Sequence, residues 1–506
     1  MTHEQIGSVD VVMKNRGYYT NLGTNFQIND HHSVGVMAQI FGNPYNNYTK
    51  VMDEAIYRNG VFEDHIVSTD MTDVPKENGA QLSAYYNGQV GKLSVDWNLD
   101  IVHRHVGQEG HIDEQSLVDS YMFDTQATRR NDMMAMKFAL SYSIGKGVLK
   151  LGTEETFVES KNSYSTSQSL LPSSNSIAKE SMVALFTEYA LSTKIGQWNA
   201  GARYEHIKLD YENVLNNNDG FVRKRDEIYP FVSWGHNLGD FYLSLNYSVK
   251  TRRPNYWHMR DAIQYHSRYV MEGGNPTLRN TINQMFSFKG GYKWFILGTE
   301  YLHAAHKILE WATPYNDQGT IMFISQNFEK PVKSITFYCI ANPVIGCWLP
   351  NYTAGFTKQH LTLDLVDDRE VSGIRTTSFN KPMYLVYANN TFNINKGKKN
   401  PWQLEFNLQY RSGMNQDNDL LIRPIWSLEA AVQKSYMDGN LTFRLSANDL
   451  LRHMTEHSSS DFGSYLVNQT FDGQRQSVKF TVHYRFNTTK SKYKGSGAGV
   501  DATNRM

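Results

Sequence analysis

The sequence lacks three features that mark common classes of protein: a long apolar segment, an excess of one charge, and a supply of cysteines. No apolar run approaches the ~18 residues that a transmembrane helix needs, and the mean hydropathy is −0.52. The 50 basic and 50 acidic residues cancel, so there is no electrostatic case for a nucleic-acid partner. Residues 1–12 also lack the basic and apolar segments of a signal peptide.

The two cysteines, Cys339 and Cys347, are too few for a disulfide scaffold. They flank an apparent turn at residues 342–346. Two unpaired thiols are the simpler interpretation, and a local disulfide in an oxidising compartment is the alternative. A zinc site is disfavoured because no second pair of ligands accompanies them.

Alternation of apolar and polar side chains dominates what the sequence does contain. In residues 241–250 every second side chain is apolar, namely Phe241, Leu243, Leu245, Tyr247 and Val249. Successive side chains of a strand point to opposite sides, so this pattern predicts a strand with one apolar face and one polar face. Five further segments repeat the pattern, at residues 93–101, 198–205, 402–411, 441–448 and 478–486. Aromatic residues near the segment ends are typical of strands that span a lipid bilayer.

About 20 such segments can be placed along the chain, and the first three cover residues 8–14, 18–28 and 31–42. Helical periodicity is absent over any comparable length. The connections between segments alternate in length: short ones include Gly91, Gly145 and residues 237–240, and long ones include residues 43–77, 254–278 and 455–473. This alternation puts all the long loops at one end of the sheet, as in outer-membrane barrels.

The pattern therefore predicts an all-β fold over residues 1–487. We expect a transmembrane antiparallel up-and-down β-barrel of about 20–22 strands, with an even strand number. Outer-membrane lipid should contact its apolar face. Residues 488–506 are predicted to form a flexible C-terminal periplasmic tail.

Two groups of residues are candidate chemical sites. His103, His105 and His111, with Asp113 and Glu114, have the side chains of a transition-metal site, but an exposed polar loop is the favoured interpretation. No Gly-x-Ser-x-Gly or HExxH motif is present. We therefore predict neither an enzyme nor a bound metal or cofactor.

The loop at residues 254–275 combines aromatic with charged side chains and should lie outside the cell. Such a combination suits a ligand surface. The candidate ligand-binding residues are Tyr256, Trp257, Arg260, Asp261, Tyr265, Arg268 and Tyr269. The alternative is a self-packed loop that caps the barrel mouth.

Two motifs resemble known sequences. Residues 251–254 (TRRP), followed by Tyr256 and by residues 274–276 (GNP) with Leu278, resemble a segment of TonB-dependent outer-membrane receptor barrels. Residues 484–487 (YRFN), which run into residues 492–505 (KYKGSGAGVDATNR), resemble the ending of the outer membrane protein beta-barrel family among these receptors.

The resemblance implies a receptor and transporter of the cell outer membrane that takes up a nutrient ligand. It implies a TonB-type energy-coupling partner for the full-length receptor, and a surface lipoprotein is a further candidate partner. Such receptors also carry a signal peptide, a coupling segment and a plug domain, which have no counterpart here. We therefore expect an N-terminally incomplete barrel part without its plug. An outer-membrane enzyme, a plain porin-like channel and a soluble carbohydrate-binding β protein are the alternatives.

Overall fold

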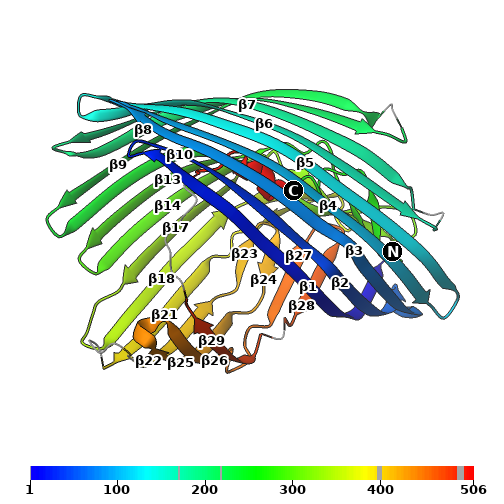
Figure 1. The fold of residues 1–506 in the computed structure, drawn as a ribbon. Coiled ribbons are helices and arrows are strands. Elements are labelled where there is room, and N and C mark those ends of the chain that lie inside the picture. The colour runs from blue at the N-terminus through cyan, green and yellow to red at the C-terminus, as the bar shows by residue number, and fades with distance from the viewer. Residues whose placement is uncertain are drawn as a thin grey trace.

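The computed structural model describes residues 2–506 except 169–170, 217–218, 396–399, 401, 474 and 487–494. One sheet of 19 strands accounts for most of these residues, and every neighbouring pair in it is antiparallel. The sheet curls into a barrel with the C-terminal helix inside it (Figure 1). Its strands, in spatial order, are β1 (His3–Asn29), β2 (His32–Arg58), β3 (Val61–Val90), β4 (Leu93–Gln115), β5 (Ser120–Ile144), β6 (Gly147–Thr166), β7 (Ser174–Thr193), β8 (Gly196–Asn213), β9 (Phe221–Leu238), β10 (Phe241–Arg252), β13 (Thr281–Tyr292), β14 (Phe295–Ala305), β17 (Val332–Ala341), β18 (Trp348–His360), β21 (Met383–Ile394), β22 (Trp402–Arg411), β25 (Ile425–Tyr436), β26 (Leu441–Asn448) and β29 (Ser477–Tyr484).

Three small sheets are built from the long connections, all at one end of the barrel, which we call the long-loop end. The other end is the short-turn end. The small sheets contain β11 (Ile263–Ser267), β12 (Val270–Gly273), β16 (Ile321–Asn327) and β15 (Ile308–Pro314); β19 (Thr362–Val366) and β20 (Ile374–Ser378); and β23 (Met414–Gln416), β24 (Asp419–Leu421), β27 (Glu456–Asp461) and β28 (Leu466–Phe471). The short helical elements are η2 (Met437–Gly439) and α1 (Val500–Arg505).

The predicted antiparallel barrel is confirmed, with differences at its first strands. The segments expected at residues 8–14 and 18–28 form the single strand β1, which continues through a register shift between Arg16 and Tyr18. Each of the other predicted segments contributes one strand to the barrel, so the described sheet has 19 strands and not an even number. Among the described residues, β1 and β29 are the two edges of this sheet.

The long loop expected at residues 43–77 is instead a tall hairpin of β2 and β3. The tip of the hairpin is Asn59–Gly60, where φ is 51° and 76°. A two-residue turn with both φ values positive matches the twist of an antiparallel pair, and Asn-Gly is the sequence it prefers. Inward residues of β2 such as Met52 and Ile56 are buried, so the alternation continues to the tip.

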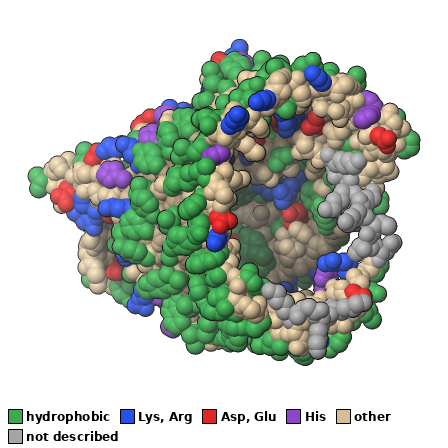
Figure 2. All heavy atoms as spheres, turned by 90° about the vertical axis from the view of Figure 1, so that its left-hand side faces the viewer, with side chains coloured by type: hydrophobic (Ala, Val, Ile, Leu, Met, Phe, Trp, Pro, Cys, Tyr) green, Lys and Arg blue, Asp and Glu red, His purple; other side chains and the backbone are tan. Residues whose placement is uncertain are grey.

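The two faces of the sheet differ as the alternation predicts. On β10, Leu245 is 50% exposed on the outer face beside Phe288, whereas inward Ser248 is buried. Viewed from the short-turn end, hydrophobic side chains cover much of the outer surface, and charged side chains line an opening into the lumen (Figure 2). No helix in the described part of the chain has the length and apolar character to cross a membrane.

Tryptophans mark the short-turn end. Five of the nine lie within a few residues of a short turn: Trp198, Trp234, Trp294, Trp348 and Trp402. Trp198 and Trp234 also contact each other across β8 and β9, with ring centroids 6.1 Å apart. Such a belt is expected where a barrel crosses a membrane–water interface.

The C-terminal residues differ from the expected flexible tail. Residues 487–494 lie outside the described part of the chain, but residues 495–506 are packed in the lumen against the inner face of β4 to β7. Ala498, Ala502 and Met506 are buried there in a cluster with wall residues such as Met133 and Val158. Small residues allow this close approach.

The two cysteines are both free thiols, Cys339 half-buried on β17 and Cys347 exposed at the following turn. The unpaired interpretation is therefore the one that the structure supports.

Candidate functional site

The connection between β10 and β13 folds inward instead of lying over the barrel mouth. Its first turns are closed by backbone hydrogen bonds from His258 N to Asn255 O (3.1 Å) and from Met259 N to Tyr256 O (3.2 Å). Tyr256 and Met259 are only 1% and 2% exposed. Residues 253–262, which we call the inward loop, thus pack on the inner wall of the barrel.

The GNP motif at residues 274–276 and Leu278 hold this loop in place. Asn275 N donates to His258 O at 2.6 Å, which ties the GNP segment to the inward loop. A Cβ at Gly274 would lie 2.0 Å from Arg260 O, so only glycine fits there. Leu278 is 1% exposed and packs with Met259. The motif therefore has a structural explanation in the folding of this loop.

A cavity of about 420 Å³ lies between the inward loop and the inner face of β4 to β6. The side chains that line it include Arg129, Asn162, Tyr164, Trp257, Arg260 and Gln264.

Two arginines flank Trp257 in this cavity. The guanidinium carbon of Arg260 is 3.4 Å from the indole centroid, and that of Arg129 is 5.3 Å from it. Arg260 donates to Trp257 O (2.9 Å), Gln264 Oε1 (3.0 Å) and Glu272 Oε1 (3.1 Å), so its position is fixed. Arg129, in contrast, makes no hydrogen bond or ion pair with any described residue. An unpaired guanidinium beside a fixed aromatic ring is suited to bind an anionic group.

The charges around the cavity are set by burial and by neighbours. Burial lowers the pKa of Arg260 to about 10, although the charge of Glu272 opposes this shift. A hydrogen bond from His266 (2.9 Å), with the charge of Arg260, lowers the pKa of Glu272 to about 2. Both groups are therefore ionised at neutral pH. Burial and the nearby Arg104 guanidinium lower the pKa of Arg129.

Of the seven predicted ligand-binding residues, only Trp257 and Arg260 line this cavity. Tyr256 donates to Glu180 on β7 at 3.1 Å. Asp261 accepts hydrogen bonds from Ser174 and, at 2.7 Å, from Asn213.

The remaining three predicted residues contact the wall nearer the long-loop end. Tyr265 donates to Glu114 on β4, and Arg268 Nε pairs with the same carboxylate at 2.8 Å. Tyr269 meets His3 edge-on, with ring centroids 4.6 Å apart. Tyr256, Asp261, Tyr265, Arg268 and Tyr269 therefore anchor the connection to the barrel wall.

Sequence reasoning missed the cavity residues that the wall supplies. Arg129 shares the inward phase of β5 with Phe123 and Met133, which are buried. The sequence feature that could have indicated Arg129 is an arginine at an inward position of a strand. Its contact with Trp257, far along the chain, depends on how the connection between β10 and β13 folds.

The histidines of the candidate metal cluster are held apart. His103 contacts Asp132 at 2.6 Å and His111 contacts Asp124 at 2.7 Å, each across β4 and β5. Over the described ranges, no group of three or more His, Cys, Asp or Glu residues is placed to hold a metal ion.

The comparisons with known proteins agree with this fold. The model of the outer membrane protein beta-barrel family matches residues 92–484. The chain belongs to the outer membrane protein beta-barrel family. No curated protein matches it in sequence.

Among solved structures, this family member resembles the copper transporter OprC, with a TM-score of 0.61 and 11% identity over 95% of this chain and 80% of that one. It also resembles the ferric yersiniabactin uptake receptor FyuA from Yersinia pestis (TM-score 0.53, 10% identity, 95% and 79% covered). A third similar structure is the FrpB iron transporter from Neisseria meningitidis, with a TM-score of 0.52 and 11% identity over 94% of this chain and 82% of that one. At such low identity, the likeness concerns the fold.

These matches confirm the resemblance to TonB-dependent receptor barrels at the level of fold. They also place this member of the outer membrane protein beta-barrel family in the cell outer membrane. The structural neighbours named above are transporters and receptors.

Proposed function

We propose that the chain is a receptor and transporter barrel that takes up a nutrient ligand, and that the ligand binds in the cavity beside Trp257. The observation that carries this proposal is the unpaired guanidinium of Arg129, which faces a cavity of about 420 Å³. The fold of the solved transporters and receptors supports it. The anchored residues of the connection hold the site, and Trp257 and Arg260 form it.

The chemistry of the lining indicates the ligand class. Arg129 offers two parallel N–H donors, which match a carboxylate or a phosphate. Asn162 Oδ1 is buried without a hydrogen-bond partner in the described structure, so a ligand hydroxyl or amide could pair with it. The ligand therefore carries at least one anionic group beside neutral polar groups.

The proposed partners follow from the same function. Uptake against a gradient needs a TonB-type partner on the short-turn side for the full-length receptor. On the opposite side, the three small sheets offer a surface for a lipoprotein that delivers the ligand. A passive porin-like channel is the second candidate, because the lumen is open at the short-turn end (Figure 2).

Arg129→Gln tests the ligand site, and Arg130→Gln is its matched control. Arg130 is the next residue on β5 but pairs with Asp132 (2.8 Å) and is exposed. Isothermal titration in detergent micelles would compare citrate, inorganic phosphate and glucose as probes. A hydrogen bond from a charged group contributes substantially to the binding free energy, so Arg129→Gln should weaken anion binding about 10- to 100-fold. Arg130→Gln should leave anion binding unchanged. Equal affinities in the two variants, or binding of glucose alone, would contradict the proposed site.

A further inference from the structure

The last twelve residues, 495–506, form an ordered segment inside the barrel, which we call the C-terminal latch. Polar side chains of the wall hydrogen-bond its backbone. Asn98 Oδ1 accepts from Ser496 N (2.9 Å) and Gly497 N (3.2 Å), and Asp100 Oδ2 accepts from Ala498 N (2.6 Å). The wall thus binds the backbone N–H groups of the residues that precede the helix α1.

The sequence of the latch suits this docking. Gly499 has φ of 63°, and a Cβ added there would lie 2.4 Å from Ala135 Cβ. A side chain at this position would therefore push the segment off the wall. On either side of Gly499, Ala498 and Ala502 pack with Val102 and Met133 of the wall.

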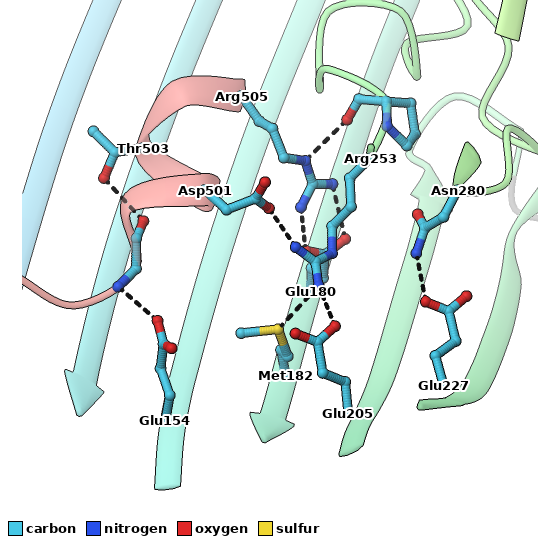
Figure 3. Close-up of polar contacts among 12 residues, drawn as sticks. Glu154, Glu180, Met182, Glu205, Glu227, Arg253, Asn280, Asp501, Thr503 and Arg505 are labelled. Atoms are coloured by element: carbon cyan, nitrogen blue, oxygen red, sulfur yellow. Dashed lines mark hydrogen bonds and ion pairs between the residues drawn. The ribbon is translucent and has the colours of Figure 1, made fainter. Parts of the chain in front are cut away.

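Charge complementarity adds to the fit. Five carboxylates form an acidic strip on the inner faces of β4, β6, β7 and β8: Asp96, Asp100, Glu154, Glu180 and Glu205. Arg505, 6% exposed, forms a bidentate pair with Glu180 at 2.6 and 3.0 Å (Figure 3). It is the only ion-pair partner of Glu180 in the described part of the chain. Removing one member of such a buried pair leaves an uncompensated charge.

The same arginine holds the inward loop. Arg505 Nε donates to Pro254 O (2.9 Å), Tyr256 N donates to Arg505 O (3.2 Å), and the guanidinium lies 4.4 Å from the Tyr256 ring centroid. Arg253, at the start of the loop, bridges Glu205 of the wall and Asp501 of the latch (2.5 Å) (Figure 3). The C-terminus and the inward loop therefore share one buried network.

We propose that the C-terminal latch is a detachable strap that controls the inward loop. While docked, the latch holds residues 253–262 against the wall. Release of the latch frees the inward loop and uncovers the acidic strip of the lumen. Because the inward loop forms one wall of the cavity beside Trp257, docking of the latch is coupled to that cavity. This inference rests on the contacts of residues 495–506 and does not require the proposed ligand.

Carboxypeptidase Y digestion of the full-length chain in detergent micelles measures docking directly. Met506 is buried, and an oxygen of its terminal carboxylate accepts from Asn131 Nδ2 at 3.3 Å, so its release should be slow in the unmodified protein. Gly499→Val and Arg505→Gln should each speed release about 10- to 100-fold, because the first adds a side chain that collides with Ala135 and the second loses a charge-assisted pair. The matched control, Arg475→Gln, removes an exposed pair with Glu456 and should have no effect.

Hydrogen exchange of residues 253–262, followed by mass spectrometry on the same variants, measures the coupling. Exchange should rise in Gly499→Val and Arg505→Gln but not in Arg475→Gln. If Met506 becomes accessible while exchange of the loop stays unchanged, the latch does not hold the loop, and the proposal is wrong.

A competition experiment with a synthetic latch peptide uses the unmodified protein, so it tests the proposal even if a variant fails to fold. The synthetic peptide GSGAGVDATNRM, at the millimolar concentrations that match an intramolecular segment, should displace the latch and speed release of Met506. A peptide of scrambled sequence should not. Rapid release of Met506 from the protein alone, or no effect of the peptide, would overturn the proposal. Neither outcome bears on anion binding by Arg129.

Discussion

Replacing an outward residue of β10 by arginine gives the most direct energetic test of the membrane barrel. Leu245 lies four residues beyond Phe241, the first residue of β10, at the short-turn end. At about 3.3 Å per residue and a strand tilt of about 40°, this distance places Leu245 about 10 Å into an apolar band about 25 Å tall. Its side chain is 50% exposed on the outer face, so it faces lipid close to the middle of the band.

Leu245→Arg should therefore lower the free energy of unfolding by about 2–4 kcal/mol, the cost of a cation at the midplane of a barrel. Asn246→Arg, its neighbour on the lumen phase, should cost far less because the lumen is polar. Reversible guanidinium unfolding in lipid vesicles, followed by tryptophan fluorescence, measures both changes. Equal costs for the two variants, or a native chain that stays soluble without detergent, would refute the assignment of the outer face to lipid.

Two further predictions concern pH and conduction. Because the folded-state pKa of Glu272 is lowered to about 2, its stabilising contribution is complete above pH ~4.5 and is lost as pH falls toward 2. The protection factors of the β11 and β12 amides, which correct for the intrinsic pH dependence of exchange, should fall over that interval and should stay constant in Glu272→Gln; a fall that begins above pH 6 would point to another group. Planar-bilayer recordings of the chain should show an open, water-filled channel, since charged side chains line an opening into the lumen at the short-turn end (Figure 2). A stable barrel that conducts nothing would mean that the docked C-terminal latch and the inward loop seal the lumen.

The strands were predictable because alternation is a local property. Leu245 faces outward and Ser248 inward for the same reason that any strand has two faces, and no distant residue has to be known. The same reasoning overlooked the continuity of β1, because Gly17 and the register shift beside it interrupt the alternation without ending the strand. It also took the β2–β3 hairpin for a loop, although the Asn59–Gly60 turn was present in the sequence.

The interior could not be predicted in the same way, because it depends on contacts between residues far apart in sequence. Asn98 and Ser496 are separated by 398 positions, and no local pattern indicates that they hydrogen-bond. A Gly-rich ending is typical of a flexible tail, yet Gly499 allows close packing on the wall. The predicted loop residues were recognised by composition, but only the fold separates Trp257 and Arg260, which line the cavity, from the residues that anchor the connection.

A density map of the full-length receptor with its natural ligand bound tests the central claim most directly. The account predicts ligand density in the cavity beside Trp257, with an anionic group within hydrogen-bonding distance of the Arg129 guanidinium. Ligand density that lies elsewhere in the lumen or on the three small sheets, with the cavity filled only by water, would contradict it.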